Sequence, residues 1–214
     1  MVYKLDVKNE NIRQCIVKMS NRIACMYDLA IEAMQSNDVD KALKVMKMDE
    51  FVNAAEEEIN QMAIESLALL SPVAKDLRVE IAAIKIASEL ERIGDYAKSV
   101  ASFIIKNGQV DEELCQLSSK IVDAALVMLD HAMEAYVNKD ADQAMIIPEE
   151  DDLIDDVFDE VIALLKKRLV SQQQIELLIP AVGMMRNLER AGDHITNICE
   201  HIVFENKGQY IEFS

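Results

Sequence analysis

The chain repeats itself at a spacing of about 100 residues, and this repeat limits which folds it can adopt more than any other feature. The segment Leu90–Asp95 (LERIGD) matches Leu188–Asp193 (LERAGD), 98 positions later. The segment Asp49–Asn53 (DEFVN) matches Asp151–Asp155 (DDLID), 102 positions later. A period this long indicates duplicated half-domains rather than a solenoid of short repeats. The fold is therefore expected to contain two equivalent units.

Composition, apolar periodicity and the residues that start or end helices predict that each unit consists of three helices. The 214 residues include only five glycines and three prolines, too few turn formers for an all-β fold. Apolar residues recur at three- and four-residue steps, as they do along one face of a helix. We expect helices over about residues 9–36, 40–70 and 71–106 in the first half, and 111–138, 140 or 148 onward, and 171–206 in the second.

The prediction is an all-α fold of two tandem, pseudo-symmetric three-helix bundles, residues 1–108 and residues 109–214. Several residues are expected to start or end helices. Ser71 followed by Pro72 is typical of a helix start, and Asn107 followed by Gly108 is typical of a helix end. Side chains that can cap helix N-termini are expected at Asp40, Asp111, Asp140 and Ser171.

Charge and cysteine usage narrow the function classes. The net charge is −17, with 39 acidic against 22 basic residues, which disfavours binding to nucleic acid or directly to anionic lipid. No signal peptide is visible, and no apolar run approaches the ~18 residues of a membrane span. The four cysteines form no CxxC pair and are expected to be buried thiols. We expect a cytoplasmic protein that meets membranes only through partners and whose acidic surface attracts cations.

Each copy of the repeat places two carboxylates one helical turn apart. Glu91 and Asp95 share one face of the third predicted helix, and Glu189 and Asp193 share one face of the sixth. Like charges at this spacing repel each other, and more strongly when they are partly buried. A cation held by both carboxylates would offset the repulsion, and hard cations or iron accept oxygen ligands. The pattern therefore favours a metal site in each half.

The second helix of each half offers a complementary row of oxygen donors. These are Asp49 and Asn53 in the first half, and Asp151 and Asp155 in the second. If the second and third helices of a half pack antiparallel, the two rows face each other. About four to eight oxygens would then converge, enough for an octahedral site or a small cluster of ions.

The alternative interpretation is that these carboxylates form ordinary surface ion pairs with Arg92 and Arg190. The duplicated Glu-Arg-x-Gly-Asp context favours the metal site. Gly94 and Gly192 lie inside predicted helices, where each costs ~1 kcal/mol relative to alanine. Glycine at two equivalent positions indicates that something bulky, or another backbone, approaches closely there.

No catalytic constellation is visible. His131, His194 and His201 belong to no HExxH motif, and none follows a Glu at the Glu-x-x-His spacing of di-iron bundles. His194 is expected beside a site or on the surface rather than as a metal ligand. Glycine-rich phosphate loops and GxSxG motifs are also missing from the sequence. We therefore expect no catalytic residues and a protein that is not an enzyme.

Two long motifs resemble those of the PhoU family. Residues 71–78 (SPVAKDLR) and 84–95 (IKIASELERIGD) are similar to the third helix of PhoU proteins. Residues 188–200 (LERAGDHITNICE) are similar to their sixth helix. The resemblance covers the entire chain in length, repeat and order of motifs.

The resemblance implies two three-helix bundles whose E(D)xxxD motifs bind iron, zinc or manganese in multinuclear sites. It also implies negative regulation of phosphate uptake and of the phosphate-starvation response. The implied partners are the ATPase subunit of a phosphate ABC transporter and a sensor histidine kinase, with a homodimer as one arrangement open to the chain. The implied metal ligands are Glu91, Asp95, Glu189 and Asp193, faced by Asp49, Asn53, Asp151 and Asp155.

The two halves of the chain differ from each other at two places that matter for the resemblance. Asn53 takes the place of Asp155, so the first site is expected to be weaker or to hold fewer metals. Residues 172–176 (QQQIE) replace the segment that holds Asp76 and Arg78, so any role of those two is confined to the first half. Three other functions stay open: an accessory protein of another phosphate transporter such as a sodium-phosphate symporter, a carboxylate-cluster metalloenzyme, and a helical adaptor without metal.

Overall fold

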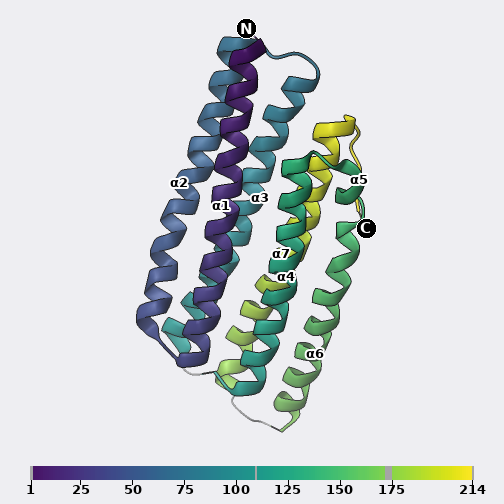
Figure 1. Cartoon of the computed structure of the whole chain (residues 1–214). Helices are drawn as coiled ribbons and strands as arrows, with labels where there is room; N and C mark the ends of the chain where they lie inside the picture. The colour runs from purple at the N-terminus through teal and green to yellow at the C-terminus, as the bar shows by residue number, and fades with distance from the viewer. Residues whose placement is uncertain (1, 109, 172–174, 214) are drawn as a thin grey trace.

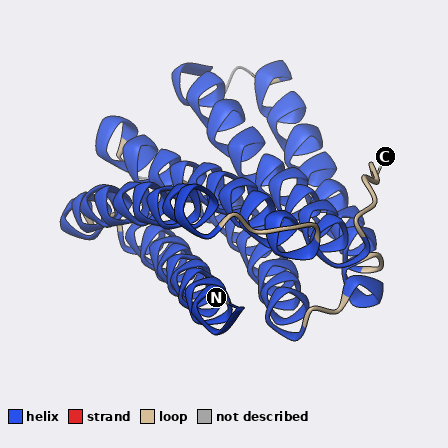
Figure 2. Cartoon of the chain, turned by 90° about the horizontal axis from the view of Figure 1, so that it is seen from above, coloured by secondary structure: helices blue, strands red, loops and turns tan. Residues whose placement is uncertain are grey.

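Every regular element in the described part of the chain is a helix (Figure 2). This computed structural model describes residues 2–108, 110–171 and 175–213. The first half consists of α1 (Val2–Ser36), α2 (Val39–Leu70) and α3 (Lys75–Asn107). The second half consists of α4 (Glu112–Asn138), the short α5 (Ala141–Ala144), the 3-10 helix η1 (Ile147–Glu150), α6 (Asp151–Val170) and α7 (Ile175–Lys207). The predicted all-α fold of two tandem three-helix bundles is confirmed.

The two bundles lie side by side (Figure 1). Helices α3 and α7 pack against each other where the bundles meet, and α1 also contacts α4. One continuous hydrophobic core runs through both halves, with Ile23 and Leu90 from the first and Met128 and Ile198 from the second. The two halves are therefore a single packed body. The predicted boundary between them adjoins residue 109, which lies outside the described residues.

A buried ion pair also ties the halves together. The guanidinium of Arg13, on α1, contacts Glu205 Oε1, on α7, at 2.5 Å. It also donates to the backbone oxygen of Tyr136, on α4, at 2.5 Å. Burial raises the pKa of Glu205, although Arg13 acts in the opposite direction. Three helices from both halves therefore meet around one cation.

One predicted helix start and one predicted helix end are confirmed. Asp111 caps α4, since its side chain accepts the Leu114 backbone N–H at 3.1 Å. Gly108 ends α3 with a φ of 74°, a left-handed value that suits glycine. Its N–H donates to the oxygen of Ile104, which satisfies one of the last carbonyls of the helix.

Three predicted helix starts are wrong. Asp38, not Asp40, caps α2, because its side chain accepts the N–H of Lys41. Ser71 does not open α3: it has a left-handed φ of 47° and ends α2. A residue before proline disfavours the helical conformation, so the chain leaves the helix there and re-enters at Lys75. Ser171 ends α6, with its N–H donating to the oxygen of Lys167.

The fifth predicted helix is broken into three pieces. Asp140 caps the four-residue α5, Pro148 lies within η1, and the long helix α6 begins only at Asp151. The break places Asp151 in the first turn of α6, where the helix dipole favours a negative charge.

The cysteine prediction is only partly correct. Cys115 and Cys199 are buried, whereas Cys15 is half-buried and Cys25 is exposed. Burial raises the pKa of Cys199 to about 12, so this thiol is unreactive. Among the helices that the structure describes, none combines the length and the apolar character needed to cross a bilayer.

Candidate functional site

The carboxylate pairs of the first half face the second-helix acids as predicted. We define the first cluster as the four residues that α2 and α3 bring together. Helix α2 packs along α3, so a row on one helix lies opposite a row on the other. The members of the first cluster are Asp49 and Asn53 on α2 and Glu91 and Asp95 on α3.

A lysine that sequence analysis missed supplies the first cluster with a cation. Lys98 Nζ lies 2.6 Å from Asp49 Oδ2 and 3.5 Å from Asp95 Oδ1. Asn53 Nδ2 donates to the same Asp49 oxygen at 3.4 Å. The carboxylate of Asp49 is buried, with 3% of its side chain exposed, so the ammonium offsets a charge that water cannot reach. The first cluster is neutralised in part by the chain itself.

Lys98 forms no ion pair with Glu91, whose carboxylate instead contacts Arg92 Nε at 3.7 Å, as the ion-pair interpretation expected. Burial raises the pKa of Glu91, and the nearby Asp95 raises it further. Glu56 and Asp49 add to the same effect from across the interface. Glu56 was also missed, although it lies close to one turn beyond Asn53 on the same helix. A search of that helix face for acidic residues at every third or fourth position would have found it.

The second cluster has one carboxylate more than the first, because Asp155 stands where the first has Asn53, and it contains no lysine. Its members are Asp151 and Asp155 on α6 and Glu189 and Asp193 on α7. Burial raises the pKa of Asp151 to about 7, and the charges of Asp155 and Asp193 contribute next. Burial also raises the pKa of Glu189, as does its neighbour Asp193. The second cluster is therefore a site of concentrated negative charge.

The position of Lys98 in the repeat is taken by Thr196, 98 residues later. The hydroxyl of Thr196 and Oδ1 of Asp151 are both buried without a hydrogen-bond partner among the described residues. A buried carboxylate oxygen without a partner is costly. Oδ1 of Asp49 in the first cluster has no partner in the described part of the chain either, so the difference between the clusters is the ammonium of Lys98, which the second cluster lacks.

The two clusters also differ in what lies next to their helical glycines. A Cβ on Gly192 would overlap Asp151 Oδ1 and lie 3.1 Å from the Cδ1 of Ile154. A Cβ on Gly94 would instead meet the Cγ1 of Val52 at 3.2 Å. The predicted close approach therefore exists at both positions, but only in the second half does a carboxylate occupy the space. Gly192 makes room for Asp151 against α7.

The second cluster has the donor set for a hard cation, although its side chains are not yet gathered around one point. In the described part of the chain, no three His, Cys, Asp or Glu side chains are close enough together to hold a metal ion as they stand. To hold one ion, the carboxylates of Asp151, Asp155, Glu189 and Asp193 would have to converge by side-chain rotation. The buried oxygen of Asp151 and the raised pKa values fit a group that would supply positive charge.

The two clusters are joined across the interface between the bundles. Tyr96 and His194 occupy equivalent places in the repeat, 98 residues apart, and the Tyr96 hydroxyl lies 2.9 Å from His194 Nε2. The contact joins α3 to α7, which pack against each other where the two bundles meet. Each of the two residues is next in sequence to a cluster member, Asp95 or Asp193, so the contact lies between the clusters.

Glu89 holds the histidine in place. His194 Nδ1 donates to Glu89 Oε2 at 2.5 Å, and Asn197 Nδ2 donates to the same oxygen at 3.3 Å. Burial alone would raise the pKa of Glu89, but the hydrogen bonds from His194 and His201 outweigh it and hold that pKa at about 2. The carboxylate can only accept, so Nδ1 carries a hydrogen. The expectation that His194 lies beside the site rather than within it agrees with this geometry.

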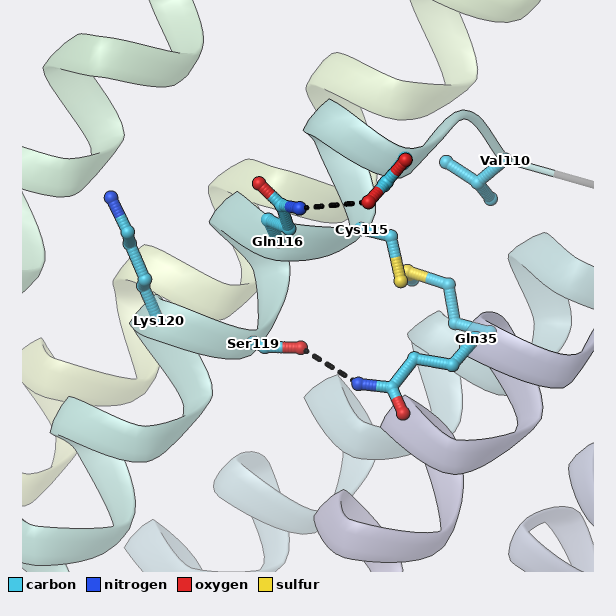
Figure 3. Close-up of a pocket in the computed structure, with 8 residues that line it drawn as sticks. Gln35, Val110, Cys115, Gln116, Ser119 and Lys120 are labelled. Carbon is cyan, nitrogen blue, oxygen red and sulfur yellow. Dashed lines mark hydrogen bonds between the residues drawn. The ribbon is translucent and has the colours of Figure 1, made fainter.

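A separate concavity between the end of α1 and the start of α4 carries no comparable chemistry (Figure 3). Gln35 donates to Ser119 Oγ at 3.4 Å, and Gln116 donates to Glu112 at 3.2 Å. Burial raises the pKa of the Cys115 thiol that also lines it. The polar groups of its lining contact one another or, in the case of Lys120, Glu160 outside it, so the acidic clusters remain the candidate site.

The structure is an all-helical protein of two equivalent bundles, each with carboxylates on its second and third long helices, and comparison with known proteins identifies the family. The family model of the PhoU domain matches residues 16–104 and 119–202. The chain therefore belongs to the PhoU family, and it contains two copies of the domain.

Characterised relatives match along nearly the whole chain. The phosphate-specific transport system accessory protein PhoU of Serratia marcescens is 31% identical over 202 residues, which is 94% of this chain and 83% of the relative. The protein of the same name from Escherichia coli (strain K12) is 30% identical, over 94% of this chain and 84% of its own length. These names describe accessory proteins rather than enzymes, in agreement with the prediction that the chain is not an enzyme.

Solved structures share the fold. The phosphate transport system regulatory protein PhoU from Streptococcus pneumoniae has a TM-score of 0.87 and 24% identity, covering 98% of this chain and 100% of that one. PhoU from Pseudomonas aeruginosa has a TM-score of 0.84 and 26% identity, covering 95% of this chain and 99% of that one.

Proposed function

We propose that this protein is a cytoplasmic accessory protein of a phosphate transport system and that it acts as a negative regulator. The observation that carries the proposal is the match to both domains of the PhoU family along nearly the whole chain. The relatives named for phosphate transport share this length and order. Its proposed partners are the ATPase subunit of a phosphate ABC transporter and a sensor histidine kinase.

The second cluster is proposed as the site of regulation by a metal ion such as iron, zinc or manganese. Support comes from the raised pKa values of Asp151, Asp155 and Glu189 and from the threonine at position 196, where the first cluster has Lys98. A bound cation would supply positive charge that offsets the repulsion. The first cluster would take a cation only if Lys98 gave way, since its ammonium already contacts Asp49 and Asp95.

Binding of a cation to the second cluster would change the surface charge of the protein. Asp155 and Asp193 are exposed members of the second cluster, so their charge reaches the surface that a partner meets. Asp151 and Glu189 lie deeper and hold the cluster to the bundle. Neutralising the cluster would alter the potential of that face, and such potentials govern association with charged partners.

The test is complementation in a bacterium whose own PhoU-family gene has been deleted. Expression of this chain should lower phosphate uptake and a phosphate-starvation reporter under phosphate-replete conditions. The variant Asp151→Asn with Asp155→Asn should regulate less well. A matched control, Glu50→Gln with Glu57→Gln, changes two exposed acids of α2 and should regulate like the parent. If the folded, expressed parent changes neither uptake nor reporter, the proposed function is wrong.

A further inference from the structure

An open groove lies between α4 and α6, on a different side of α6 from the second cluster. Its volume is about 890 Å³. The floor is apolar, formed by Ala124 and Val127 on α4 and by Leu153 and Val157 on α6. Val127 and Leu153 are 54% and 58% exposed, which is unusual for aliphatic side chains that lie together. We call this feature the α4–α6 groove.

The equivalent groove in the first half is closed by an arginine. At the spacing of 102 residues, Leu153 corresponds to Phe51, Val157 to Ala55 and Ala124 to Arg22. The guanidinium of Arg22 lies over the Phe51 ring, 4.9 Å from its centre. The groove there measures only about 270 Å³. Replacement of the arginine by alanine in the second half leaves the apolar floor uncovered.

The rim of the α4–α6 groove is strongly acidic. It carries Asp123, Glu149, Glu150, Asp152, Asp156 and Glu160. The two basic groups of the lining are already engaged, since Lys120 pairs with Glu160 at 3.6 Å and His131 contacts Glu150 at 2.9 Å. Within the described part of the chain, Asp123, Asp152 and Asp156 have no ion-pair partner. An occupant must therefore be apolar on one side and positively charged on its flanks.

The length of the groove suits a short helix. Its lining on α4 extends from Lys120 to His131, which corresponds to about 16 Å along a helix, or three turns. A helix laid in a groove contacts it through residues at i, i+3, i+4 and i+7. A second copy of this chain is a poor occupant because its net charge is −17, and anionic lipid or nucleic acid is repelled for the same reason.

We propose that the α4–α6 groove docks a basic amphipathic helix of a partner protein, about three turns long. Apolar side chains of that helix cover Val127 and Leu153, and its lysines or arginines face the rim acids, among them Asp152 and Asp156. The apolar contacts supply affinity, and the charges select the partner and its orientation. The inference does not depend on metal binding or on a role in phosphate transport.

The probe is a synthetic peptide of about 14 residues made of leucine and lysine, with leucines on one helical face. A control peptide has the same composition in an order that gives no apolar face. Binding is measured by fluorescence anisotropy at about 150 mM salt, where exposed charges are largely screened beyond ~8 Å. The amphipathic peptide should bind at least about tenfold more tightly and should shift backbone NMR signals of α4 and α6. Equal binding of the two peptides would overturn the proposal, because charge alone would then explain it.

Substitutions in matched grooves locate the site. Val127→Lys with Leu153→Lys should weaken binding of the amphipathic peptide at least about tenfold. The equivalent change in the first half, Cys25→Lys with Phe51→Lys, adds the same charge and should leave binding nearly unchanged. All four positions are exposed, so both variants should fold. Equal loss in the two variants would contradict docking in the α4–α6 groove, and so would a stable dimer of the parent that only Val127→Lys with Leu153→Lys makes monomeric.

Discussion

The two acidic clusters have nearly the same carboxylates and opposite electrostatic balance. In the first, the ammonium of Lys98 lies between Asp49 and Asp95. In the second, Thr196 takes the place of the lysine, and Asp151 is left with a pKa near 7. Duplication has preserved the paired acids while only one copy keeps its counterion. The comparison indicates that the first cluster carries part of its own neutralising charge, whereas the second carries more acid and no lysine.

The groove between α1 and α2 and the α4–α6 groove differ in the same way as the clusters: at the position compared, only the first half has a basic side chain. Arg22 covers Phe51 in the first half, and its counterpart Ala124 leaves the second-half groove open. In both comparisons a basic side chain of the first half, Lys98 or Arg22, is replaced by a small neutral one, Thr196 or Ala124. The first half therefore covers part of its acidic cluster and part of its apolar groove with its own basic side chains. The second half leaves its acidic cluster without a lysine and its apolar groove uncovered.

The largest expected effect is stabilisation by metal through the second cluster. Binding to the folded state alone raises the free energy of unfolding by about 2.7 kcal/mol at a hundredfold excess over Kd. The melting temperature should therefore rise with added manganese, zinc or iron and fall with chelator. Glu189→Gln with Asp193→Asn should remove most of this response and raise the metal-free melting temperature, because repulsion is relieved. Calorimetry with and without metal measures both changes.

The first cluster provides the control for that experiment. Glu91→Gln with Asp95→Asn makes the same chemical change beside Lys98. It should leave most of the metal response intact, because the second cluster is unchanged. If the second-half variant melts lower without metal and still responds like the parent, its carboxylates are ordinary ion-pair partners.

Removal of Lys98 should leave the first cluster without its counterion, as the second cluster is, although Asn53 still stands in place of Asp155. Loss of one partner from a buried pair costs about 3–5 kcal/mol, but the Lys98 side chain is 33% exposed, so solvent screening reduces this. We expect Lys98→Thr to lower the free energy of unfolding by about 2 kcal/mol at neutral pH, measured by urea denaturation. Lys98→Thr should also give the first cluster a metal response of its own.

A surface lysine distinguishes this effect from a general loss of charge. Lys120 and Glu160 are each 59% exposed, and such pairs contribute about 0–1 kcal/mol. Lys120→Thr should therefore change stability little. Similar losses for Lys120→Thr and Lys98→Thr would show that Lys98 is not a buried counterion.

The helical class and the carboxylate pairs could be predicted because both depend on spacing along one helix. Apolar periodicity identified α1 to α4 to within a few residues at most ends, and the four-residue spacing of Glu91 and Asp95 placed them on one face. The start of α3 could not be settled in this way, because Ser71 before Pro72 suits either a helix start or a helix break. Contacts with the rest of the bundle decide between them.

The counterion could not be predicted because it depends on reach between helices. Lys98 lies three residues after Asp95, but its closest partner is Asp49 on α2. Comparison of matched residues alone also hid the change to Thr196, which lies outside the aligned Leu-Glu-Arg-x-Gly-Asp segments. An alignment extended by one more turn would have revealed the substitution, though not the direction in which the lysine points.

The pH dependence of stability should separate the clusters further. The pKa of Asp151 is about 7 in the folded state against an ordinary value of 3.8. The folded state therefore holds this proton more tightly than the unfolded chain. Its stabilising contribution is complete below about pH 4 and is lost as the pH rises through about 7. Because Asp151 is only partly buried, we expect a loss of about 1–2 kcal/mol for the metal-free protein.

Asp151→Asn isolates this contribution. Urea denaturation between about pH 4 and pH 8 should show a flatter decline in the free energy of unfolding for the variant than for the parent. Asp156→Asn, which changes an exposed acid of the same helix, should keep the slope of the parent. A parent slope unchanged by Asp151→Asn would mean that other groups carry the pH dependence.

The smallest expected effect is the reverse exchange, Thr196→Lys, which supplies the second cluster with the missing ammonium. The new charge can approach Asp151 as Lys98 approaches Asp49, but ordering a lysine costs side-chain entropy and the outer acids are exposed to water. We therefore expect a gain of only about 1 kcal/mol in the metal-free protein at neutral pH. Lysine also favours helix more than threonine does, and Thr196→Gln provides that advantage without the charge. Thr196→Lys should exceed Thr196→Gln in stability, lower the pKa of Asp151 as followed by NMR titration, and weaken the response to metal. If the two variants are equally stable and both still respond to metal like the parent, the ammonium of Lys98 is not what distinguishes the first cluster from the second.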